Sequence, residues 1–179
     1  MSSTSSDTIS TSGDPAGDVM KNIVGGIAYG GCPLPGLATA GQPTAGELRA
    51  LGDAGVKAVL DLRHPTEPRG FDEAATARAA GLRYENIPVT PATLHEDDFA
   101  RVRAFLNEAA NRPVLVHCAS ANRVGALLIP YLVLDAGHTI KAALQLAQGV
   151  GLRSPELAAA AEQYVRAQGA ADPLSPSEA

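Results

Sequence analysis

Hydrophobic positions along the chain form short apolar runs that alternate with longer stretches of helical periodicity. Residues 56–62 and 114–117 are apolar runs too short for a helix, and they predict buried strands. Three further strands are predicted at residues 23–31, 37–41 and 82–89.

Amphipathic stretches between these runs predict six helices. They are expected at residues 47–54, 71–80, 93–110, 123–136, 139–148 and 155–168. Thr44 and Glu47 have the spacing of a capping box, so Thr44 is expected to open the first helix. Thr93 and Glu96 have the same spacing ahead of the third helix. Ser154 is the expected N-cap of the last one.

Strands that alternate with helices are typical of α/β proteins with a parallel sheet. We therefore expect three layers, with a central, mostly parallel sheet flanked by helices. A chain of 179 residues suits a single domain, which we place at residues 21–168. Residues 1–20 are rich in Ser, Thr, Gly and Asp and are expected to be a disordered tail, with a second, flexible tail at residues 169–179.

The balance of charge and the lack of long apolar runs limit the possible partners. A formal net charge of −5 disfavours nucleic acid. No apolar run approaches the ~20 residues needed to span a bilayer. The N-terminal segment also lacks the features of a signal peptide. We expect a cytoplasmic monomer that binds neither nucleic acid nor membranes.

Two cysteines do not make a disulfide framework in a domain of this size. Cys32 is expected to be a free thiol; the alternative is a resolving thiol that traps an oxidised Cys118 as a disulfide. The four histidines are scattered without the spacing of metal ligands, so neither a metal nor another cofactor is expected. They are His64, His95, His117 and His138.

The residues with the clearest chemistry follow the strand at 114–117. His117 and Cys118 end this strand, and Arg123 opens an apolar helix after a short loop. Backbone N–H groups in such a loop can converge on one anion. The fork of donors on Arg123 suits a phosphate-like group, and the same positive surroundings favour the thiolate of Cys118. We call residues 118–123 the cysteine loop, and the sequence predicts that it binds an oxyanion beside a sulfur nucleophile.

Several stretches of residues 27–165 resemble one known family. They are Gly41-Gln42-Pro43-Thr44, Ala58-Val59-Leu60-Asp61-Leu62-Arg63, Leu82-Arg83-Tyr84, Ile87-Pro88-Val89 and His117-Cys118-Ala119-Ser120-Ala121-Asn122-Arg123-Val124-Gly125. The family is the beta-lactamase hydrolase-like, phosphatase-like group of the protein tyrosine phosphatase superfamily. The resemblance implies a three-layer phosphatase-like fold with Cys118 as nucleophile and Arg123 as phosphate ligand. The intervening loop residues would complete the phosphate site, which comprises Ala119, Ser120, Ala121, Asn122 and Arg123.

Two features of the loop depart from the common tyrosine phosphatase pattern. Four residues separate Cys118 from Arg123, where that pattern has five, and four is also the number found in rhodanese-type sulfurtransferases. Ala121 occupies a position where glycine is more usual. If the loop requires a positive φ there, alanine costs about 1 kcal/mol.

The supporting roles are less defined by the sequence. His117 either orients the cysteine loop or is a buried histidine with a structural role. Related phosphatases often place an acid just after the strand that corresponds to residues 82–89, but Thr90 and Pro91 stand there. A general acid must then be sought at Asp61, Asp97 or Asp98.

The sequence also suggests roles for other residues around the cysteine loop. Arg63 is expected to pair with Glu67 or Asp61, and Asn122 to hold the loop in shape. Ser120 could donate a hydrogen bond to the Cys118 thiolate. Tyr84 and His95 are the candidates for an aromatic wall.

Three functions follow from these residues. The first is a metal-independent cysteine phosphatase that hydrolyses phosphate monoesters on proteins or small molecules through a phosphocysteine at Cys118. The second is a rhodanese-like sulfurtransferase that carries a persulfide on the same sulfur. The third is a binding module for a phosphorylated or otherwise anionic ligand.

Overall fold

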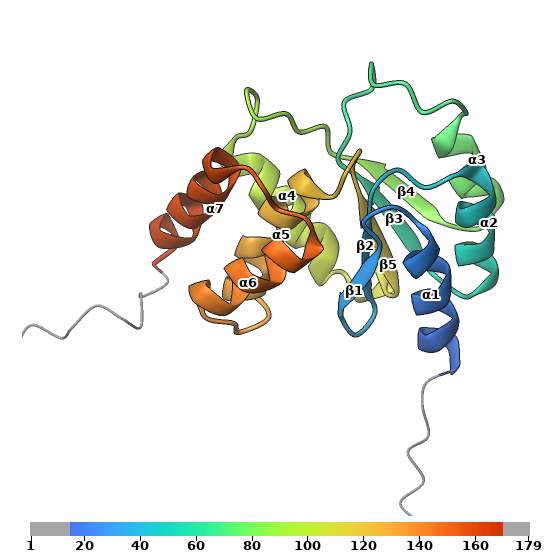
Figure 1. Ribbon diagram of the computed structural model, residues 1–179, viewed down its shortest axis with the longest axis horizontal. Coiled ribbons are helices and arrows are strands. Elements are labelled where there is room, and N and C mark those ends of the chain that lie inside the picture. The colour runs from blue at the N-terminus through green and yellow to red at the C-terminus, as the bar shows by residue number, and fades with distance from the viewer. Residues whose placement is uncertain (1–14, 170–179) are drawn as a thin grey trace, which may run out of the picture.

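The computed structural model describes residues 15–169, which form an α/β fold around one five-stranded sheet (Figure 1). The strands are β1 (Gly31–Leu34), β2 (Leu37–Ala40), β3 (Ala58–Asp61), β4 (Arg83–Asn86) and β5 (Val114–His117). Their order is β1-β2-β5-β3-β4, and every pairing is parallel except the edge hairpin of β1 with β2. The mostly parallel sheet expected from the sequence is confirmed.

Helices cover both faces of the sheet and complete the three layers (Figure 1). They are α1 (Pro15–Gly26), α2 (Ala45–Asp53), α3 (Glu73–Ala79), α4 (Glu96–Asn107), α5 (Asn122–Leu134), α6 (Ile140–Val150) and α7 (Pro155–Ala167), with a short 3-10 helix at Ala109–Asn111. The first three helices pack on one face, and α4 to α7 pack on the other. No helix within residues 15–169 is both long and apolar enough to cross a bilayer.

The alternation of side chains along the central strands divides the core into two clusters. Val114 and Val116 of β5 contact the cluster of α4 to α7, whereas Leu115 between them contacts the cluster of α1 to α3. Leu60 and Val59 of β3 divide in the same way. Both faces of these strands are therefore buried, which explains why they appear in the sequence as continuous apolar runs.

The prediction for the N-terminal region is wrong in two respects. Residues 23–31 were expected to form a strand, but helix α1 extends to Gly26. Met20, Val24 and Ile27 are buried at the spacing of one helical face. The helix also begins at Pro15, so residues 15–20 are part of the fold and the expected tail boundary at residue 20 is too late. The rest of that tail, and all of the second tail except Gly169, lie outside the described residues.

The two expected capping boxes have different outcomes. Thr44 caps α2 and receives the backbone N–H of Glu47, while the Glu47 carboxylate accepts from the N–H of Thr44 at 2.7 Å. Thr93, however, does not open α4. Its hydroxyl accepts from the N–H of Thr90, and the helix begins three residues later at Glu96. Ser154 caps α7 as expected.

Candidate active site

The cysteine loop lies at the carboxyl edge of the sheet, between the end of β5 and the start of α5. The sulfur-bearing side chain of Cys118 is buried, with 1% of the residue exposed. The first turn of a helix has no intrahelical acceptors for its N–H groups, so α5 offers those of Asn122 and Arg123 to the loop. Ala121 precedes them with φ 58°, in the left-handed region. The positive φ considered at the sequence level is therefore present, and the loop adopts it with alanine.

Glu67 and two backbone carbonyls hold Arg123 in place. Its Nη1 donates to Glu67 Oε1 at 2.7 Å and to the carbonyl of Val89 at 2.9 Å, with a longer contact to the carbonyl of Leu62. Its Nη2 donates to Glu67 Oε2 at 2.9 Å. These bonds use one end of the guanidinium. The Nε hydrogen and one Nη2 hydrogen have no acceptor oxygen within residues 15–169, and they form a second parallel pair of donors.

Charge couples this arginine to both its neighbours. The hydrogen bond with Glu67 raises the pKa of Arg123 against the opposing effect of burial, and a charged Cys118 sulfur raises it further. In return, the hydrogen bond from Arg123 is the largest cause that lowers the pKa of Glu67 to about 2. Glu67 is therefore an anion throughout the physiological pH range, and Arg123 is a fixed cation beside Cys118.

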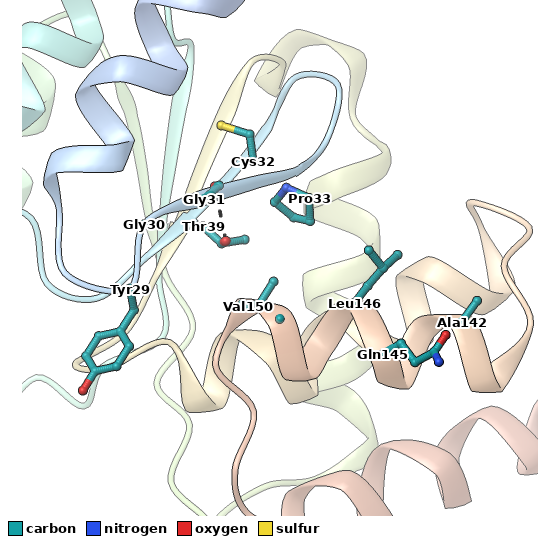
Figure 2. A pocket seen from close by; sticks show the side chains of 11 residues that line it. Tyr29, Gly30, Gly31, Cys32, Pro33, Thr39, Ala142, Gln145, Leu146 and Val150 are labelled. Atoms are coloured by element: carbon teal, nitrogen blue, oxygen red, sulfur yellow. Dashed lines mark hydrogen bonds between the residues drawn. The ribbon is translucent and has the colours of Figure 1, made fainter.

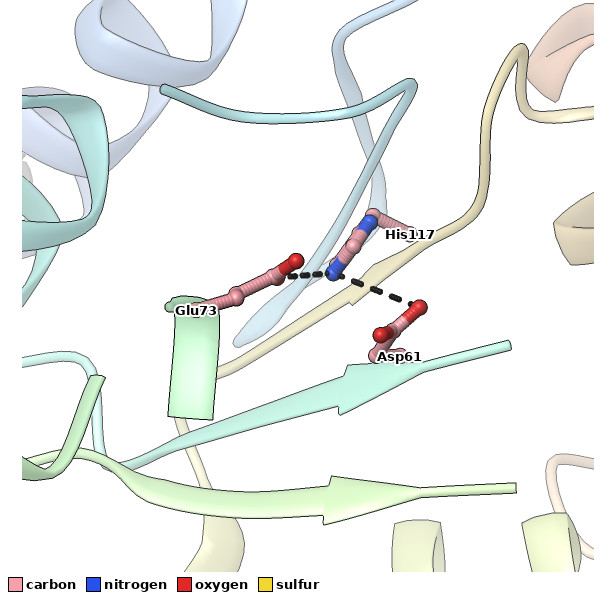
Figure 3. A group of neighbouring side chains, drawn as sticks. All are labelled: Asp61, Glu73 and His117. Atoms are coloured by element: carbon pink, nitrogen blue, oxygen red, sulfur yellow. Dashed lines mark ion pairs between the residues drawn. The ribbon is translucent and has the colours of Figure 1, made fainter. Parts of the chain in front are cut away.

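A second polar cluster is buried beneath the other end of the loop (Figure 3). His117 Nε2 lies 2.6 Å from Glu73 Oε1 and 3.8 Å from Asp61 Oδ1, and all three side chains are at most 1% exposed. Neither contact has hydrogen-bond geometry, so His117 Nε2 and Glu73 Oε1 are buried polar atoms in close contact without a hydrogen bond. Burial alone would raise the pKa of Glu73, but the contacts with His117, Gln42 and Arg69 together hold it below its ordinary value.

Asp61, Glu73 and His117 place three potential ligand atoms within 4.8 Å of one another, a grouping that the sequence spacing did not suggest. The positively charged Arg69 side chain lies against two members of this group. Its Nη2 lies 2.5 Å from Asp61 Oδ2, and its Nε lies 3.2 Å from Glu73 Oε2. The Arg69 guanidinium pairs with one oxygen of each carboxylate, so it offsets one of the two negative charges in this cluster.

Polar side chains join His117 to Arg123 in one chain of contacts. Glu73 Oε2 accepts from Gln42 Nε2 at 2.9 Å, and Gln42 Oε1 accepts from Arg63 Nη1. Arg63 Nε then donates to the Glu67 carboxylate that holds Arg123. We call the six residues the polar relay: His117, Glu73, Gln42, Arg63, Glu67 and Arg123. It fixes the residue before Cys118 and the residue that ends the cysteine loop relative to each other.

The connection between α6 and α7 supports the loop from outside. Asn122 Oδ1 accepts from the backbone N–H groups of Arg153 and Ser154 at 2.7 and 3.2 Å. The expectation that Asn122 holds the loop in shape is therefore confirmed. Ser120 Oγ accepts from Arg153 Nη2 at 2.9 Å, so Ser120 faces this connection.

The structure separates the three carboxyl groups considered as general acids. Asp61 is fully buried; its Oδ1 accepts from the N–H of Arg63 and its Oδ2 from Arg69 and Tyr84. These contacts occupy both of its oxygens, so Asp61 is the least accessible of the three candidates. Asp98 Oδ2 caps the N–H of His95, whereas Asp97 is exposed on the first turn of α4.

The structure also shows the contacts of Arg63 and Tyr84, two further residues considered from the sequence. Arg63 pairs with Glu67, as expected, and is 7% exposed. Tyr84 donates to buried Asp61, so it belongs to the buried cluster and does not form a wall of the cysteine loop. Tyr29 is an aromatic residue near the cysteine loop. Its ring centroid lies 5.4 Å from the guanidinium of Arg153, which contacts Ser120.

Cys32 lies on edge strand β1 beside a groove of about 430 Å³ between the hairpin and α6, and its sulfur points away from α6 (Figure 2). Leu146 and Val150 line the opposite side of this groove. Strand β2 separates β1 from β5, which places Cys32 roughly 10 Å from β5 across two strand spacings. A disulfide requires Cα atoms within about 7 Å, so Cys32 is not placed to resolve an oxidised Cys118.

Sequence reasoning missed four residues that matter here. Glu67 was expected only as a partner of Arg63, Glu73 appeared as an ordinary acid at a helix start, and Arg69 appeared as an ordinary base. Arg153 lies 30 residues beyond Arg123 and carries no motif. The local signal that was available is the density of charge between residues 61 and 73, immediately after a buried strand.

Comparisons with known proteins point to one family. The profile of "Beta-lactamase hydrolase-like protein, phosphatase-like domain" matches residues 34–129. The Beta-lactamase hydrolase-like protein of Agrobacterium fabrum is 33% identical over 105 residues, which is 55% of this chain and 24% of that protein. This chain thus matches about a quarter of the length of its curated relative.

Solved structures share the fold at lower identity. A DUF442 protein from Shewanella putrefaciens CN-32 superposes with a TM-score of 0.70 at 23% identity, covering 82% of this chain and 97% of that one. TpbA of P. aeruginosa, in a variant form complexed with pTyr, has a TM-score of 0.58 at 23% identity, covering 75% and 86%.

Proposed function

Because the chain belongs to the family of the beta-lactamase hydrolase-like protein phosphatase-like domain, we propose that it is a cysteine-dependent phosphatase of phosphate monoesters. One observation carries the proposal. Glu67 binds one end of the Arg123 guanidinium, the parallel donors at its other edge have no oxygen acceptor among residues 15–169, and the same guanidinium interacts with the Cys118 sulfur. A bidentate arginine next to a thiolate suits a phosphoryl group under attack by sulfur.

The chemistry runs in two steps. Cys118 Sγ attacks phosphorus, the P–S bond forms, and the bond from phosphorus to the ester oxygen breaks. Arg123 and the N–H groups at the start of α5 stabilise the charge that develops on the equatorial oxygens. Water then attacks the phosphocysteine, which releases inorganic phosphate and restores the thiolate. Neither step needs a metal ion.

The leaving oxygen needs a proton in the first step. Asp97 is the candidate we keep, because Asp61 is buried in ion pairs and Asp98 caps its own helix. Its exposed carboxyl on the first turn of α4 follows the segment that begins at Val89, whose carbonyl contacts Arg123. Asp97→Asn should lower the rate of hydrolysis about 100-fold for phosphate esters of weakly acidic alcohols. The rate for esters of acidic phenols should change little.

The phosphatase proposal is tested by release of 4-nitrophenol from 4-nitrophenyl phosphate. Wild type should turn over, Cys118→Ser should be inactive, and Arg123→Lys should lose at least about 100-fold in kcat/KM, because lysine cannot bind two oxygens in parallel. Arg101→Lys, on the exposed face of α4, is the matched control and should retain full activity. Equal turnover by Cys118→Ser and wild type would contradict the proposal.

A sulfurtransferase is the second candidate, and the length of the cysteine loop favours it. Four residues between cysteine and arginine match the rhodanese type. In that reaction Cys118 takes the outer sulfur of thiosulfate, sulfite leaves, and the persulfide then transfers this sulfur to cyanide as thiocyanate. Thiocyanate formation that depends on Cys118, without hydrolysis of aryl phosphates, would replace the phosphatase with this activity. Absence of activity in both assays would favour a binding module for anions.

A further inference from the structure

A second arginine lies at the rim of the cysteine loop. Arg153, in the connection between α6 and α7, donates from Nη2 to Ser120 Oγ at 2.9 Å and from Nη1 to the carbonyls of Gly151 and Ser120 at 2.9 and 3.3 Å. Ser120 is two residues from Cys118, so their Cα atoms are at most about 7.6 Å apart. The Arg153 guanidinium is therefore fixed close to the proposed phosphate site.

The charge of Arg153 is not neutralised. The ion pairs among residues 15–169 include Arg63, Arg69 and Arg123 but not Arg153. Its three hydrogen bonds all run to neutral oxygens. In the described part of the chain its Nε hydrogen and one Nη2 hydrogen have no acceptor, and the residue is exposed.

Tyr29 holds the guanidinium from the other side. Its ring centroid lies 5.4 Å from Arg153 Cζ, and the tyrosine itself is 55% exposed with φ 59°. The ring points away from Cys32 and Pro33 of the groove (Figure 2). A large exposed aromatic in a left-handed conformation is costly, and here it stacks on an otherwise unpaired cation. Ser120 and Tyr29 together restrict Arg153 before any ligand binds.

We propose that Arg153 forms a second anion subsite, so that the preferred substrates carry another anionic group, such as a second phosphate, beside the phosphoryl group held by Arg123. The proposal rests on the proposed function, since it assumes that the cysteine loop binds phosphate. It specifies a substrate class for that function: phosphate monoesters whose leaving group carries a negative charge are preferred over those whose leaving group is uncharged. Arg153 binds and selects in this scheme and takes no part in bond breaking.

Binding of inorganic anions to a Cys118→Ser protein tests the subsite without catalysis. Isothermal titration would compare phosphate, pyrophosphate and tripolyphosphate at low ionic strength, where exposed charges are least screened. We expect tripolyphosphate to bind at least about fivefold more tightly than phosphate, which is the scale of one charge-assisted contact. Arg153→Met should reduce this ratio to about twofold or less, because tripolyphosphate loses more affinity than phosphate, and Arg153→Lys should restore part of it.

The matched control is Arg166→Met. It removes the same charge from the last turn of α7, about 16 Å along the helix from Pro155. This variant should keep the full preference for tripolyphosphate.

The outcomes separate the two proposals. If no anion binds to any variant, the proposed function itself is contradicted. If phosphate binds but the preference survives Arg153→Met, the subsite is overturned and the phosphatase stands. If Arg153→Met weakens phosphate and tripolyphosphate equally, Arg153 only braces Ser120, and the subsite is again overturned.

Discussion

Glu67 holds Arg123 through both of its carboxylate oxygens, at 2.7 and 2.9 Å, across 56 residues of sequence. The pair leaves Arg123 with one edge that bonds to no oxygen of residues 15–169, and it keeps Glu67 ionised far below the ordinary pKa of a glutamate. Glu67 therefore orients the Arg123 guanidinium toward the proposed phosphate site, although the negative charge of Glu67 alone would repel the substrate.

The first prediction concerns the stability that this pair contributes. The pKa of Glu67 falls from 4.5 to about 2 on folding, so the contribution is complete above pH 4.5 and is lost as the pH falls toward 2. The shift corresponds to roughly 3 kcal/mol as an upper bound, because solvent screens the partly exposed pair. Glu67→Gln should thus be less stable than wild type at pH 6, and urea unfolding should show most of this difference gone at pH 3. A difference that is constant with pH would contradict the assigned pairing.

The second prediction concerns the buried cluster. Glu73→Ala removes the buried carboxylate that pairs with Arg69, lies 2.6 Å from His117 Nε2 and accepts from Gln42, and it should reduce the free energy of unfolding by about 3–5 kcal/mol. Glu85→Ala, whose carboxylate is 40% exposed and lies 3.7 Å from Arg101, should cost less than about 1 kcal/mol. Chemical denaturation of both variants provides the comparison, and similar losses would argue against the cluster.

A double-mutant cycle tests the close approach beneath the cysteine loop. A Cβ added at Gly151, where φ is 135°, would lie 3.1 Å from Ala121 Cβ. Gly151→Ala should therefore cost more than about 1 kcal/mol, whereas Ala121→Gly should be neutral or stabilising because φ is positive there. The double variant should recover part of the loss. Strict additivity of the two unfolding free energies would show that the side chains do not touch.

Gly125 is expected to tolerate no side chain. Gly125 lies in the first turn of α5, and an added Cβ would meet the carbonyl of Ala147 at 2.7 Å and Leu152 Cβ at 2.8 Å. Gly125→Ala should cost about 1–3 kcal/mol through overpacking between α5 and α6. Gly149→Ala, with nothing within 4 Å, should be stabilising by up to about 1 kcal/mol. Thermal unfolding of both proteins measures the contrast.

Local patterns predicted most of the fold, and their failures have physical causes. The apolar run around Val24 is too short to distinguish a strand from a helix by itself, and Gly25 and Gly26 favoured the strand. The spacing of Thr93 and Glu96 fits a capping box, but Thr93 bonds to Thr90 instead. In both cases, packing or a neighbouring turn decided between two local structures of similar energy.

The site was predictable where it is local and was missed where it is not. Cys118 and Arg123 share one loop, so their proximity follows from the sequence. The partners of Arg123 and His117 lie 56 and 44 residues away, on segments that only the folded sheet brings together. Arg153 was missed for the same reason, since its contact with Ser120 spans 33 residues.

The polar relay draws its six side chains from the end of β5, from α3 and α5, and from the loops after β2 and β3. A folding intermediate that had formed only β5 and α5 would contain the whole cysteine loop without the contacts that orient it. Competence to bind an anion therefore depends on the assembled sheet, and an occupied site would in turn hold the two core clusters together.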